Sequence, residues 1–542
     1  MQEQNKGSFF DPKTIIAVVL VGAVWYGWQT YLQNKYPNYN KPKTAEVSTS
    51  LGGQVPTNNA THPETTTTTT TATTTTIDGK SSLQPTVAKE IKFEDQNVSF
   101  TLTSRGMGLK DYTLNKYIDY DKKPILLGLS DSDSLFELKL AGATKPLDFD
   151  LREEAPGQYV GTASVGDSTL TRTLKYDSEK LSFTNKIVIE KPNEEILRGI
   201  SLVIPEKVTV PQSTSFLFPS YQHQDFFVNH AGKTETVNFS AAKENVTKSF
   251  SPANIVSVSS QYFSAAIIDR SELLPETQLI SDVAARTARA ELTYKPNAGQ
   301  SQIALEQVFY AGPKSIDILK SIDPQLPGVI DHGFFSFIAR PLLYIMKAFY
   351  SGLGNWGLAI ICLTLLVRLC VLPFAVMSAK SMKAMQKIQP QLVAVRERYK
   401  ADPVAMNRET MALMKQNKAN PLGGCLPMLL QIPIFFALYR VIGSSIELYH
   451  SPFYGWITDL SSHDKFYVLP IIMGVAMFLQ TKLTPTTMDP AQAKIMAFLP
   501  LVFTLFMVQL PAGLTLYMCV STLFGITQQM IFLRDKNKVA TA

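Results

Sequence analysis

Cysteine is scarce in this sequence: the 542 residues include four, all in apolar runs, at Cys362, Cys370, Cys425 and Cys519. None lies in the large middle region, and their spacing contains no CxxC pair of the kind that binds a metal or cycles as a redox disulfide. Disulfide cross-links are therefore excluded for the middle region, and we expect these thiols to pack as small apolar side chains.

A complete phosphate-binding loop, with the pattern G-x-x-x-x-G-K-[ST], is also missing. The triplet G-K-[ST] occurs at residues 79–81 and 232–234, but Thr74 and Phe227 stand where the first glycine belongs. We expect no nucleotide-driven motor, no enzymatic activity and no cofactor.

Charge is unevenly spread along the chain. Charged residues make up 18% of the sequence, hydrophobic residues make up 45%, and the formal net charge is +6. Residues 380–418 hold nine lysines or arginines against three acids, a local charge of +6, so the rest of the chain sums to about zero. The basic character therefore belongs to one segment and not to the protein as a whole.

Long apolar runs lie once near the start and then crowd the last third of the chain. Each is close to the roughly 20 residues that cross a bilayer. The runs are residues 15–32, 355–376, 426–445, 466–483, 494–510 and 512–533. The first has no A-x-A cleavage site and an aromatic flank, so we expect an uncleaved anchor rather than a cleaved signal peptide. Only Pro511 separates the last two, which predicts a tight hairpin.

The basic segment sets the direction of these spans, because positively charged loops stay in the cytoplasm. Residues 380–418 are then cytoplasmic, and alternation places both chain ends in the cytoplasm and residues 35–340 in the periplasm. The acidic loop at 446–465 falls on the periplasmic side too. The sequence thus predicts a multi-pass protein of the bacterial inner membrane.

The middle region changes character after a threonine-rich stretch at 37–87, which cannot bury enough apolar surface to fold and serves as a linker. Beyond it, hydrophobic and polar residues alternate as they do in short strands. Examples are residues 134–140, 168–176, 181–190, 253–260 and 288–296. A region of about 240 residues with this pattern predicts a β-sandwich of two packed sheets.

The expected fold is a polytopic α-helical membrane protein with six transmembrane helices and a large periplasmic β-sandwich domain. Its expected parts are an N-terminal transmembrane anchor at 1–33, the linker at 34–88, the β-sandwich at 89–332, an interfacial amphipathic helix at 333–354, and a membrane core at 355–542 with a cytoplasmic helical hairpin at 380–420. Arg340, Pro341 and Lys347 interrupt the amphipathic helix too strongly for it to span a membrane.

Arg368 is the most informative residue of the apolar runs, because an arginine at mid-membrane costs ~2.5–3.5 kcal/mol on insertion scales. No acidic residue lies in the transmembrane segments to pair with it. A water-filled cavity around the guanidinium is one explanation. The other is snorkelling, in which the side chain covers about half of the ~12 Å to the cytoplasmic end of its helix.

Further polar residues of the spans could share a groove with this arginine. They are Thr364, Gln431, Tyr517, Ser521 and Gln528. The first lies one helical turn before the arginine, and the last three share one face at spacings of four and seven. Each alone could simply join two helices by a hydrogen bond. Together with the arginine they predict a polar groove that opens to the cytoplasm.

The basic segment predicts a helical hairpin, because its apolar residues recur every three or four positions on both sides of a turn at 401–403. Its methionine-rich, basic surface could contact a nascent chain, a ribosome or anionic lipid headgroups. A solvated hairpin that merely obeys the positive-inside rule explains the same pattern. The candidate contact residues are Lys383, Met385, Lys387, Arg396, Arg398 and Met411.

Several segments of the last third carry a specific resemblance. They are VRLCVLPF at 367–374, NPLGGCLPMLLQIPIFFALYR at 420–440, SPFYGWITDLSSHDKFYVLPIIMGVAMFLQ at 451–480, KLTPTTMDPAQAKIMAFLP at 482–500 and LPAGLTLYMCVSTLFGITQQ at 510–529. They closely resemble the YidC/Oxa1/Alb3 family of membrane protein insertases, in the form of Gram-negative bacteria. The likeness covers about 210 residues of the core, and the layout of anchor, linker and middle domain extends it over the chain.

The resemblance implies a five-helix insertase core with a hydrated, positively charged groove, closed to the periplasm, and a β-supersandwich in the periplasm. Arg368 would attract the acidic or polar tail of a substrate, Thr364 and Tyr517 would line its route into lipid, and Gln431 would keep the groove hydrated. The hairpin at 381–419 would receive the substrate first. The implied partners are nascent membrane proteins and the Sec translocon, which the largely dispensable periplasmic domain contacts.

Two features depart from the family pattern. Arg440 stands near the periplasmic end of the third span, where an uncharged residue is usual. The tail after Leu533 has nine residues, so a long ribosome-binding tail of the kind some relatives carry is not expected.

Two other functions remain open at this stage. A secondary transporter for a small anion could use the membrane arginine as its site, although no clear internal repeat of the kind found in transporters is present. A membrane-anchored, sugar-acting periplasmic enzyme could use the middle domain. Its candidate residues match no metal-site or catalytic-triad spacing; they are His223, His230 and His332 with Asp225 and Glu235 nearby.

Overall fold

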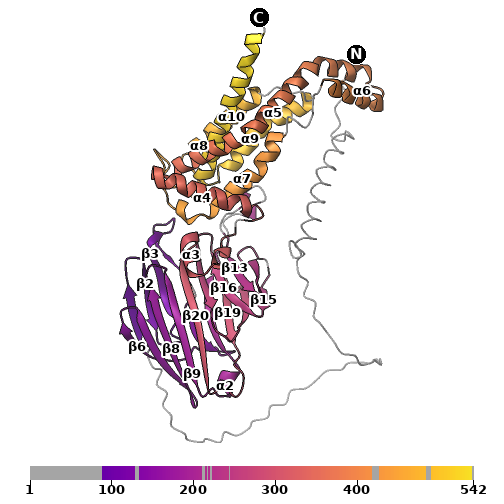
Figure 1. Ribbon diagram of the computed structural model, residues 1–542. Helices are drawn as coiled ribbons and strands as arrows, with labels where there is room; N and C mark the ends of the chain where they lie inside the picture. The colour runs from indigo at the N-terminus through magenta and orange to yellow at the C-terminus, as the bar shows by residue number, and fades with distance from the viewer. Residues whose placement is uncertain are drawn as a thin grey trace, which may run out of the picture. The chain divides into compact units, whose positions relative to one another are not determined.

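The computed structural model describes residues 88–128, 133–209, 214–215, 218–219, 223–242, 244–331, 333–417, 426–483 and 490–539. The predicted span at 15–32 and the linker at 37–87 lie outside these residues, as do His332 and Cys425. The helices and strands are labelled in Figure 1.

The β-rich middle region predicted from the alternating pattern is confirmed, and each of the five stretches expected to be extended contains a strand. The described strands are β1 (Glu90–Glu94), β2 (Val98–Thr103), β3 (Leu109–Ile118), β4 (Pro124–Leu126), β5 (Glu137–Leu140), β6 (Asp150–Ala155), β7 (Gln158–Val165), β8 (Ser168–Asp177), β9 (Ser182–Glu190), β10 (Ile200–Lys207), β11 (Thr214–Ser215), β12 (Phe218–Pro219), β13 (Asp225–His230), β14 (Lys233–Asn238), β15 (Val246–Phe250), β16 (Ala253–Ser259), β17 (Phe263–Asp269), β18 (Glu276–Asp282), β19 (Thr287–Tyr294) and β20 (Gln302–Pro313).

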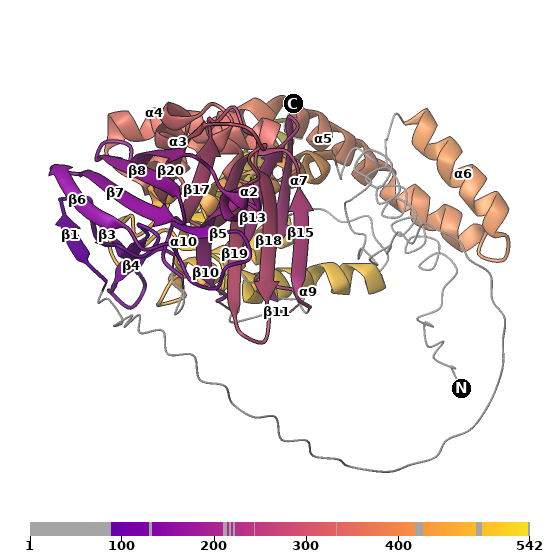
Figure 2. The same cartoon turned by 90° about the horizontal axis from the view of Figure 1, so that it is seen from below.

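These strands form antiparallel sheets. The largest has nine strands in the order β14-β13-β16-β17-β20-β9-β8-β7-β6, and a second has five in the order β15-β18-β19-β10-β5. Figure 2 shows β15, β18, β19 and β10 side by side, as this order requires. Strands β1 to β4 make a further sheet in chain order, and β11 pairs with β12.

The sheets pack face to face around a buried arginine. The ring of Phe136, just before β5, stacks on Phe309 of β20 with the ring centroids 4.5 Å apart. Arg172 of β8 is completely buried beside them and donates to the carbonyl oxygen of Phe136 at 2.9 Å, to that of Gly106 at 2.6 Å and to Asn185 Oδ1 at 2.7 Å. Burial lowers the pKa of Arg172 to about 9, so the guanidinium stays charged at neutral pH. This bonding fixes one sheet against the other.

The rest of the described chain is mainly helical. The helical elements are α2 (Glu194–Leu197), α3 (Ile316–Ile322), the 3-10 turn η1 (Leu326–Val329), α4 (Ser336–Leu353), α5 (Trp356–Arg398), α6 (Pro403–Gln416), α7 (Leu426–Ser444), the 3-10 turn η3 (Ile446–Leu448), α8 (Val468–Leu483), α9 (Pro490–Met507) and α10 (Ala512–Val539). Four of them, α7 to α10, match predicted apolar runs to within a few residues at most ends.

A sharp corner joins the amphipathic helix α4 to the long helix α5. Gly354 ends α4 in the left-handed region at φ 64°, which a residue without a Cβ adopts at little cost. The side chain of Asn355 then accepts a hydrogen bond from the backbone N–H of Leu358 at 3.1 Å and so caps the start of α5. The sequence pair Gly-Asn therefore encodes the turn from the amphipathic helix into the first apolar helix of the core.

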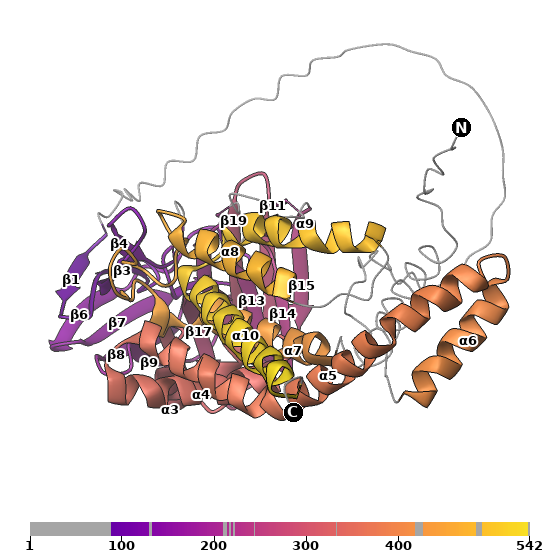
Figure 3. The ribbon, with the colours of Figure 1, turned by 90° about the horizontal axis from the view of Figure 1, so that it is seen from above.

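Helix α5 runs unbroken for 43 residues, so the apolar run at 355–376 and the first arm of the basic hairpin are one helix. Pro373 and Pro390 lie within it, and each proline removes a single backbone donor without ending the helix. The predicted turn at 401–403 is confirmed: Asp402 caps α6 by accepting from the N–H groups of Val404 and Ala405. Figure 3 shows α6 running back along the end of α5.

Within the described residues, two helices are long and apolar enough to cross a membrane, α5 and residues 512–531 of α10. Residues 431–444, 468–483 and 498–507 are shorter apolar helices. Several of their large side chains face outward, for example Ile471 and Val475 on α8 and Leu501 and Leu505 on α9, each about 60% exposed. Such an extended apolar surface is unsuited to water and fits contact with lipid.

Candidate functional site

Arg368 of α5 reaches across to α10. Its Nε donates to Ser521 Oγ at 2.9 Å, and its Nη2 donates to the same oxygen. The Ser521 side chain is buried, whereas that of Arg368 is half-buried. A guanidinium carries five N–H groups, so one hydroxyl oxygen satisfies only part of its hydrogen-bonding capacity. This contact brings together two of the residues that the sequence predicts to share a groove.

A second polar pair joins α7 to α10 one turn away. Gln431 donates through Nε2 to the hydroxyl oxygen of Tyr517, and the Tyr517 side chain is buried. Because Tyr517 and Ser521 are four residues apart on α10, both pairs lie on the same helical face. Helices α5, α7 and α10 thus contribute four of the predicted groove residues to one polar cluster.

The remaining two predicted groove residues are placed differently. Thr364 is 1% exposed and donates its hydroxyl to the Ile360 carbonyl oxygen of its own helix at 2.7 Å. That donor is therefore already used, and the side chain can offer only its remaining lone pair to a neighbour. Gln528 is half-buried on α10, about 10 Å along the helix from Ser521. None of the described hydrogen bonds joins it to the cluster.

Helix α8 supplies a polar neighbour that the sequence analysis missed. A Cβ built on Gly525 of α10 would lie 3.0 Å from Nε2 of Gln480, so the glutamine side chain packs against that glycine. Gly525 follows Ser521 by one turn, which brings Gln480 to the same side of α10. A glutamine within an otherwise apolar helix was the signal that could have identified it.

The charge at the cluster is not neutralised by an acid. In the part of the chain that the structure covers, no carboxylate forms an ion pair with Arg368, and its hydrogen-bond acceptor is the neutral Ser521 hydroxyl. A buried charge without a counter-ion is costly unless water or a ligand solvates it. The cluster can therefore attract an anionic group.

The helical hairpin has a small apolar core of its own. Ile388 and Leu392 of α5 are buried and pack with Met385 against Leu413 and Met414 of α6. Met385, predicted as a contact residue, is therefore half-buried within this core.

The other predicted contact residues of the hairpin are more accessible. Lys387, Arg396 and Arg398 are exposed, Lys383 is half-buried, and Met411 is 73% exposed. The hairpin therefore presents basic side chains together with an accessible methionine.

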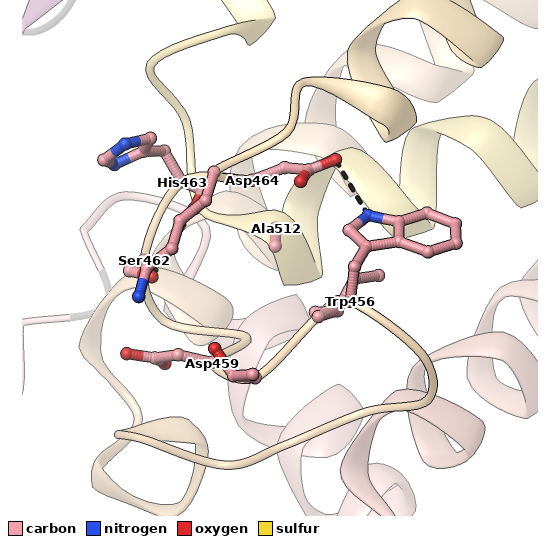
Figure 4. Close-up of a pocket in the computed structure, with 9 residues that line it drawn as sticks. Trp456, Asp459, Ser462, His463, Asp464 and Ala512 are labelled. Atoms are coloured by element: carbon pink, nitrogen blue, oxygen red, sulfur yellow. Dashed lines mark hydrogen bonds between the residues drawn. The ribbon is translucent and has the colours of Figure 1, made fainter.

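The loop between α7 and α8, residues 445–467, closes the opposite end of the helices. Figure 4 shows part of this loop beside Ala512 at the start of α10. Asp464 is buried there, accepts from the Trp456 indole at 3.3 Å and from the Leu469 N–H at 2.8 Å, and so caps α8. The pocket in this loop is also lined by Ala512, which lies about 14 Å along α10 from Ser521. The Asp464 carboxylate that lines it already serves this structural role.

The described histidines of the β-rich region do not gather into a site. His223 lies 3.3 Å from Asp225, and the ring of His230 packs on Phe250 at 4.8 Å. Among the residues that the structure describes, no group of three histidines, cysteines or acids is placed to hold a metal.

Comparison with known proteins gives two family matches. Residues 348–539 match the family described as 60Kd inner membrane protein, and residues 204–345 match the family described as YidC periplasmic domain. The membrane protein insertase YidC of Pelobacter propionicus is 33% identical over 564 aligned positions, covering 96% of this chain and 98% of that protein.

A higher identity is confined to part of the chain. The membrane protein insertase YidC of Geotalea daltonii is 49% identical over 271 residues, and this match spans about half of each protein, 50% of this chain and 51% of the relative. A crystal structure of an active YidC insertase with its first transmembrane domain resolved aligns with 81% of this chain and 92% of its own, at 21% identity and a TM-score of 0.38.

Proposed function

The chain belongs to the YidC family of membrane protein insertases, and we propose that it moves hydrophobic segments and short tails of nascent proteins from the cytoplasm into the inner membrane. It works alone or with the Sec translocon, through a hydrated, positively charged groove centred on Arg368. The large β-rich domain is periplasmic, and both chain ends are cytoplasmic.

The observation that carries the groove proposal is the bonding of Arg368. Its guanidinium lies between apolar helices, and its described acceptor is the uncharged hydroxyl of Ser521. A structural arginine in such a place would be expected to pair with an acid, because ion pairing offsets part of the desolvation cost. A guanidinium without an acidic partner keeps its full positive charge, which can then attract an anionic group of the substrate.

The physical role of this charge is to lower the barrier for a polar tail. A short tail that crosses the membrane loses its hydration, and a carboxylate suffers most. A water-filled half-channel shortens the dry part of the path, and the positive charge attracts the carboxylate within it. For an acidic tail the membrane potential adds ~2.3 kcal/mol per charge per 100 mV. Burial of the apolar segment in lipid then drives the process to completion.

The other polar residues of the cluster keep the groove hydrated. The hydrogen bond between Gln431 and Tyr517 uses only part of the hydrogen-bonding capacity of each side chain, so both can still bind a water molecule. Gln480 adds an amide from α8. Substrate release needs only lateral movement into lipid, so no bond of the substrate is made or broken.

The hairpin formed by the end of α5 and α6 receives the substrate first. Its exposed Lys387, Arg396 and Arg398 suit anionic lipid headgroups or a ribosome, and Met411 offers a flexible apolar contact for a hydrophobic segment. Nascent membrane proteins and the Sec translocon are the proposed partners.

The test replaces the native insertase of a Gram-negative host with this protein. A host depleted of its own insertase expresses the wild type, Arg368→Ala, Arg368→Lys or the surface control Arg152→Ala, whose side chain is 74% exposed in the periplasmic domain. Insertion of a small coat-type substrate is scored by protease protection, once with an acidic tail and once with the same tail neutralised.

We expect wild type and Arg152→Ala to restore insertion of both substrates. Arg368→Ala should fail mainly with the acidic tail, and Arg368→Lys should keep part of the activity because it keeps the charge. If Arg368→Ala inserted the acidic and the neutralised tail equally well, the positive charge of Arg368 would play no part in the mechanism. If the stably expressed wild type restored neither substrate, the insertase proposal itself would be rejected, and an anion transporter would become the better hypothesis.

A further inference from the structure

An aromatic socket on the periplasmic domain holds a tyrosine from the α7–α8 loop. Tyr449 of the loop packs with its ring centroid 5.9 Å from Tyr120, 4.7 Å from Tyr262 and 5.6 Å from Phe263. Its hydroxyl donates to the carbonyl oxygen of Ile118 at 2.8 Å. The tyrosine therefore makes ring contacts on several sides and a hydrogen bond at its tip.

The socket has the form of an interface hot spot. Tyr262 and Phe263 are only 4% and 5% exposed, and Tyr120 forms a rim that is 52% exposed. The pairs that Tyr449 makes with Tyr120 and Phe263 are edge-to-face, a geometry that contributes beyond simple area burial. A tyrosine that packs on buried rings and has a hydrogen-bonded hydroxyl is the type of side chain that contributes strongly to protein interfaces.

The neighbouring His450 fixes the loop to the same carbonyl group. Its Nε2 lies 3.0 Å from the Ile118 carbonyl oxygen and its Nδ1 lies 2.9 Å from Asp459 Oδ2. The imidazole thus joins the periplasmic domain to a second point of the loop.

Polar contacts around the socket add specificity rather than strength. Gln261 donates to the Gly443 carbonyl oxygen at 2.6 Å. Arg440, the unusual charge at the end of α7, lies 3.7 Å from Asp331, and both side chains are nearly half exposed. Exposed ion pairs contribute only about 0–1 kcal/mol. The half-buried Tyr449 ring, packed on the buried Tyr262 and Phe263, is therefore the main anchor.

The loop that carries Tyr449 also holds two helices of the polar cluster. A Cβ on Gly357, in the first turn of α5, would overlap the ring of Phe453. The backbone N–H groups of Ala512 and Gly513, at the start of α10, donate to loop carbonyls at 2.7 and 2.9 Å. The start of α10 at Ala512 can be followed beside the loop in Figure 4. The loop is therefore packed against both helices that position Arg368 and its hydroxyl acceptor.

We propose that Tyr449 is the plug of a docking joint, by which the loop that closes the periplasmic end of the helices is anchored in the Tyr120–Tyr262–Phe263 socket of the periplasmic domain. The partner of this surface is thus a segment of the same chain. The joint gives the periplasmic domain a mechanical role: it steadies the loop, and through the loop the first turns of α5 and α10.

The test measures the solvent accessibility of the socket in the purified full-length protein in lipid nanodiscs. Hydroxyl-radical footprinting with mass spectrometry reads the oxidation of Tyr262 and Phe263. The test variant is Tyr449→Ala. The matched control is Tyr454→Ala, which removes a 59% exposed tyrosine of the same loop that does not contact the socket. Phe309, buried in the sheet core, reports whether the domain stays folded.

We expect Tyr449→Ala to raise the oxidation of both socket rings several-fold, with Phe309 unchanged and Tyr454→Ala like the wild type. Socket oxidation that stays at the wild-type rate in Tyr449→Ala would overturn the joint. If Phe309 oxidation also rose, the milder Tyr449→Leu decides: a rise confined to the socket supports the joint, and no rise refutes it. The measurement needs no substrate, so its outcome is independent of the proposed insertase activity.

Discussion

The guanidinium of Arg368 and the hydroxyl of Ser521 join α5 to α10 through a 2.9 Å hydrogen bond from Nε. This bond positions the cation without cancelling its charge, because the acceptor is neutral. An acid at position 521 would hold the guanidinium in the same place and neutralise it. Substitutions at position 521 can therefore test separately whether insertion needs a positioned arginine and whether it needs a net positive charge.

We expect Ser521→Asp to lose insertion of acidic-tailed substrates nearly as completely as Arg368→Ala, because the new carboxylate occupies the cation. Ser521→Asn is the matched control: it has nearly the same shape, offers an amide oxygen and leaves the charge free, so most activity should remain. Protease protection of the inserted tail is the measurement. If Asp and Asn behaved alike, a free positive charge would not be what the site supplies.

The hydrogen bond between Gln431 and Tyr517 can be weighed by a double-mutant cycle of Gln431→Leu and Tyr517→Phe. Hydrogen bonds between membrane helices average about 0.6 kcal/mol in such cycles. We therefore expect a small coupling energy in thermal unfolding of the purified protein, yet a clear loss of insertion in each single variant because groove hydration falls. If the coupling energy were large and insertion normal, the pair would instead serve to stabilise the contact between α7 and α10.

Much of the fold could be predicted from the sequence because its patterns are local. The alternation in residues 168–176 gives β8 (Ser168–Asp177) almost to the residue. Pro511 marks the turn between α9 and α10, since a proline is well placed at the start of a new helix. Arg368 could be identified because a charge among apolar residues is costly wherever its partners lie.

Other features depend on contacts between distant parts of the chain, and no local pattern carries them. Arg440 was recognisable as unusual, but its partner Asp331 precedes it by more than a hundred residues. The use of the Thr364 hydroxyl within its own helix depends on a side-chain rotamer. Helix α5 continues past two prolines, against the local preference of that residue, and the sequence pattern alone does not predict this.

A buried arginine should dominate the stability of the periplasmic domain. Arg172→Ala removes the donor to Asn185 Oδ1 and to the Phe136 carbonyl oxygen, whereas the Gly106 carbonyl oxygen keeps the backbone N–H of Leu138. Each buried hydrogen bond left unmade costs about 1–3 kcal/mol. We expect a large fall in the unfolding temperature of this domain. The measurement is thermal unfolding monitored by the circular dichroism signal of the β-sheets. The control Arg152→Ala should shift stability by no more than about 0.5 kcal/mol. A mild Arg172→Ala phenotype would mean that water replaces the guanidinium.

A buried lysine beside the aromatic socket predicts a specific pH dependence. Lys314 is 3% exposed and donates from Nζ to the Ser260 carbonyl oxygen at 2.8 Å. Burial lowers its pKa to about 8, against the opposing effect of the Asp225 and Asp331 carboxylates. Because the folded-state pKa lies below the ordinary lysine value of about 10.4, the unfolded chain binds more protons between these two values, and stability gains from this group as the pH rises through that window.

Lys314→Met removes this titration and keeps an apolar side chain of similar length. The unfolding free energy of the variant relative to the wild type should therefore fall as the pH is raised from about 7 to about 10, by an amount on the order of 3 kcal/mol at most. The lost hydrogen bond to Ser260 affects both pH values equally and cancels from the comparison. Thermal unfolding of both proteins at the two pH values is the measurement. A difference between them that does not change with pH would show that Lys314 titrates alike in the folded and unfolded states, which would contradict its dry burial beside the socket.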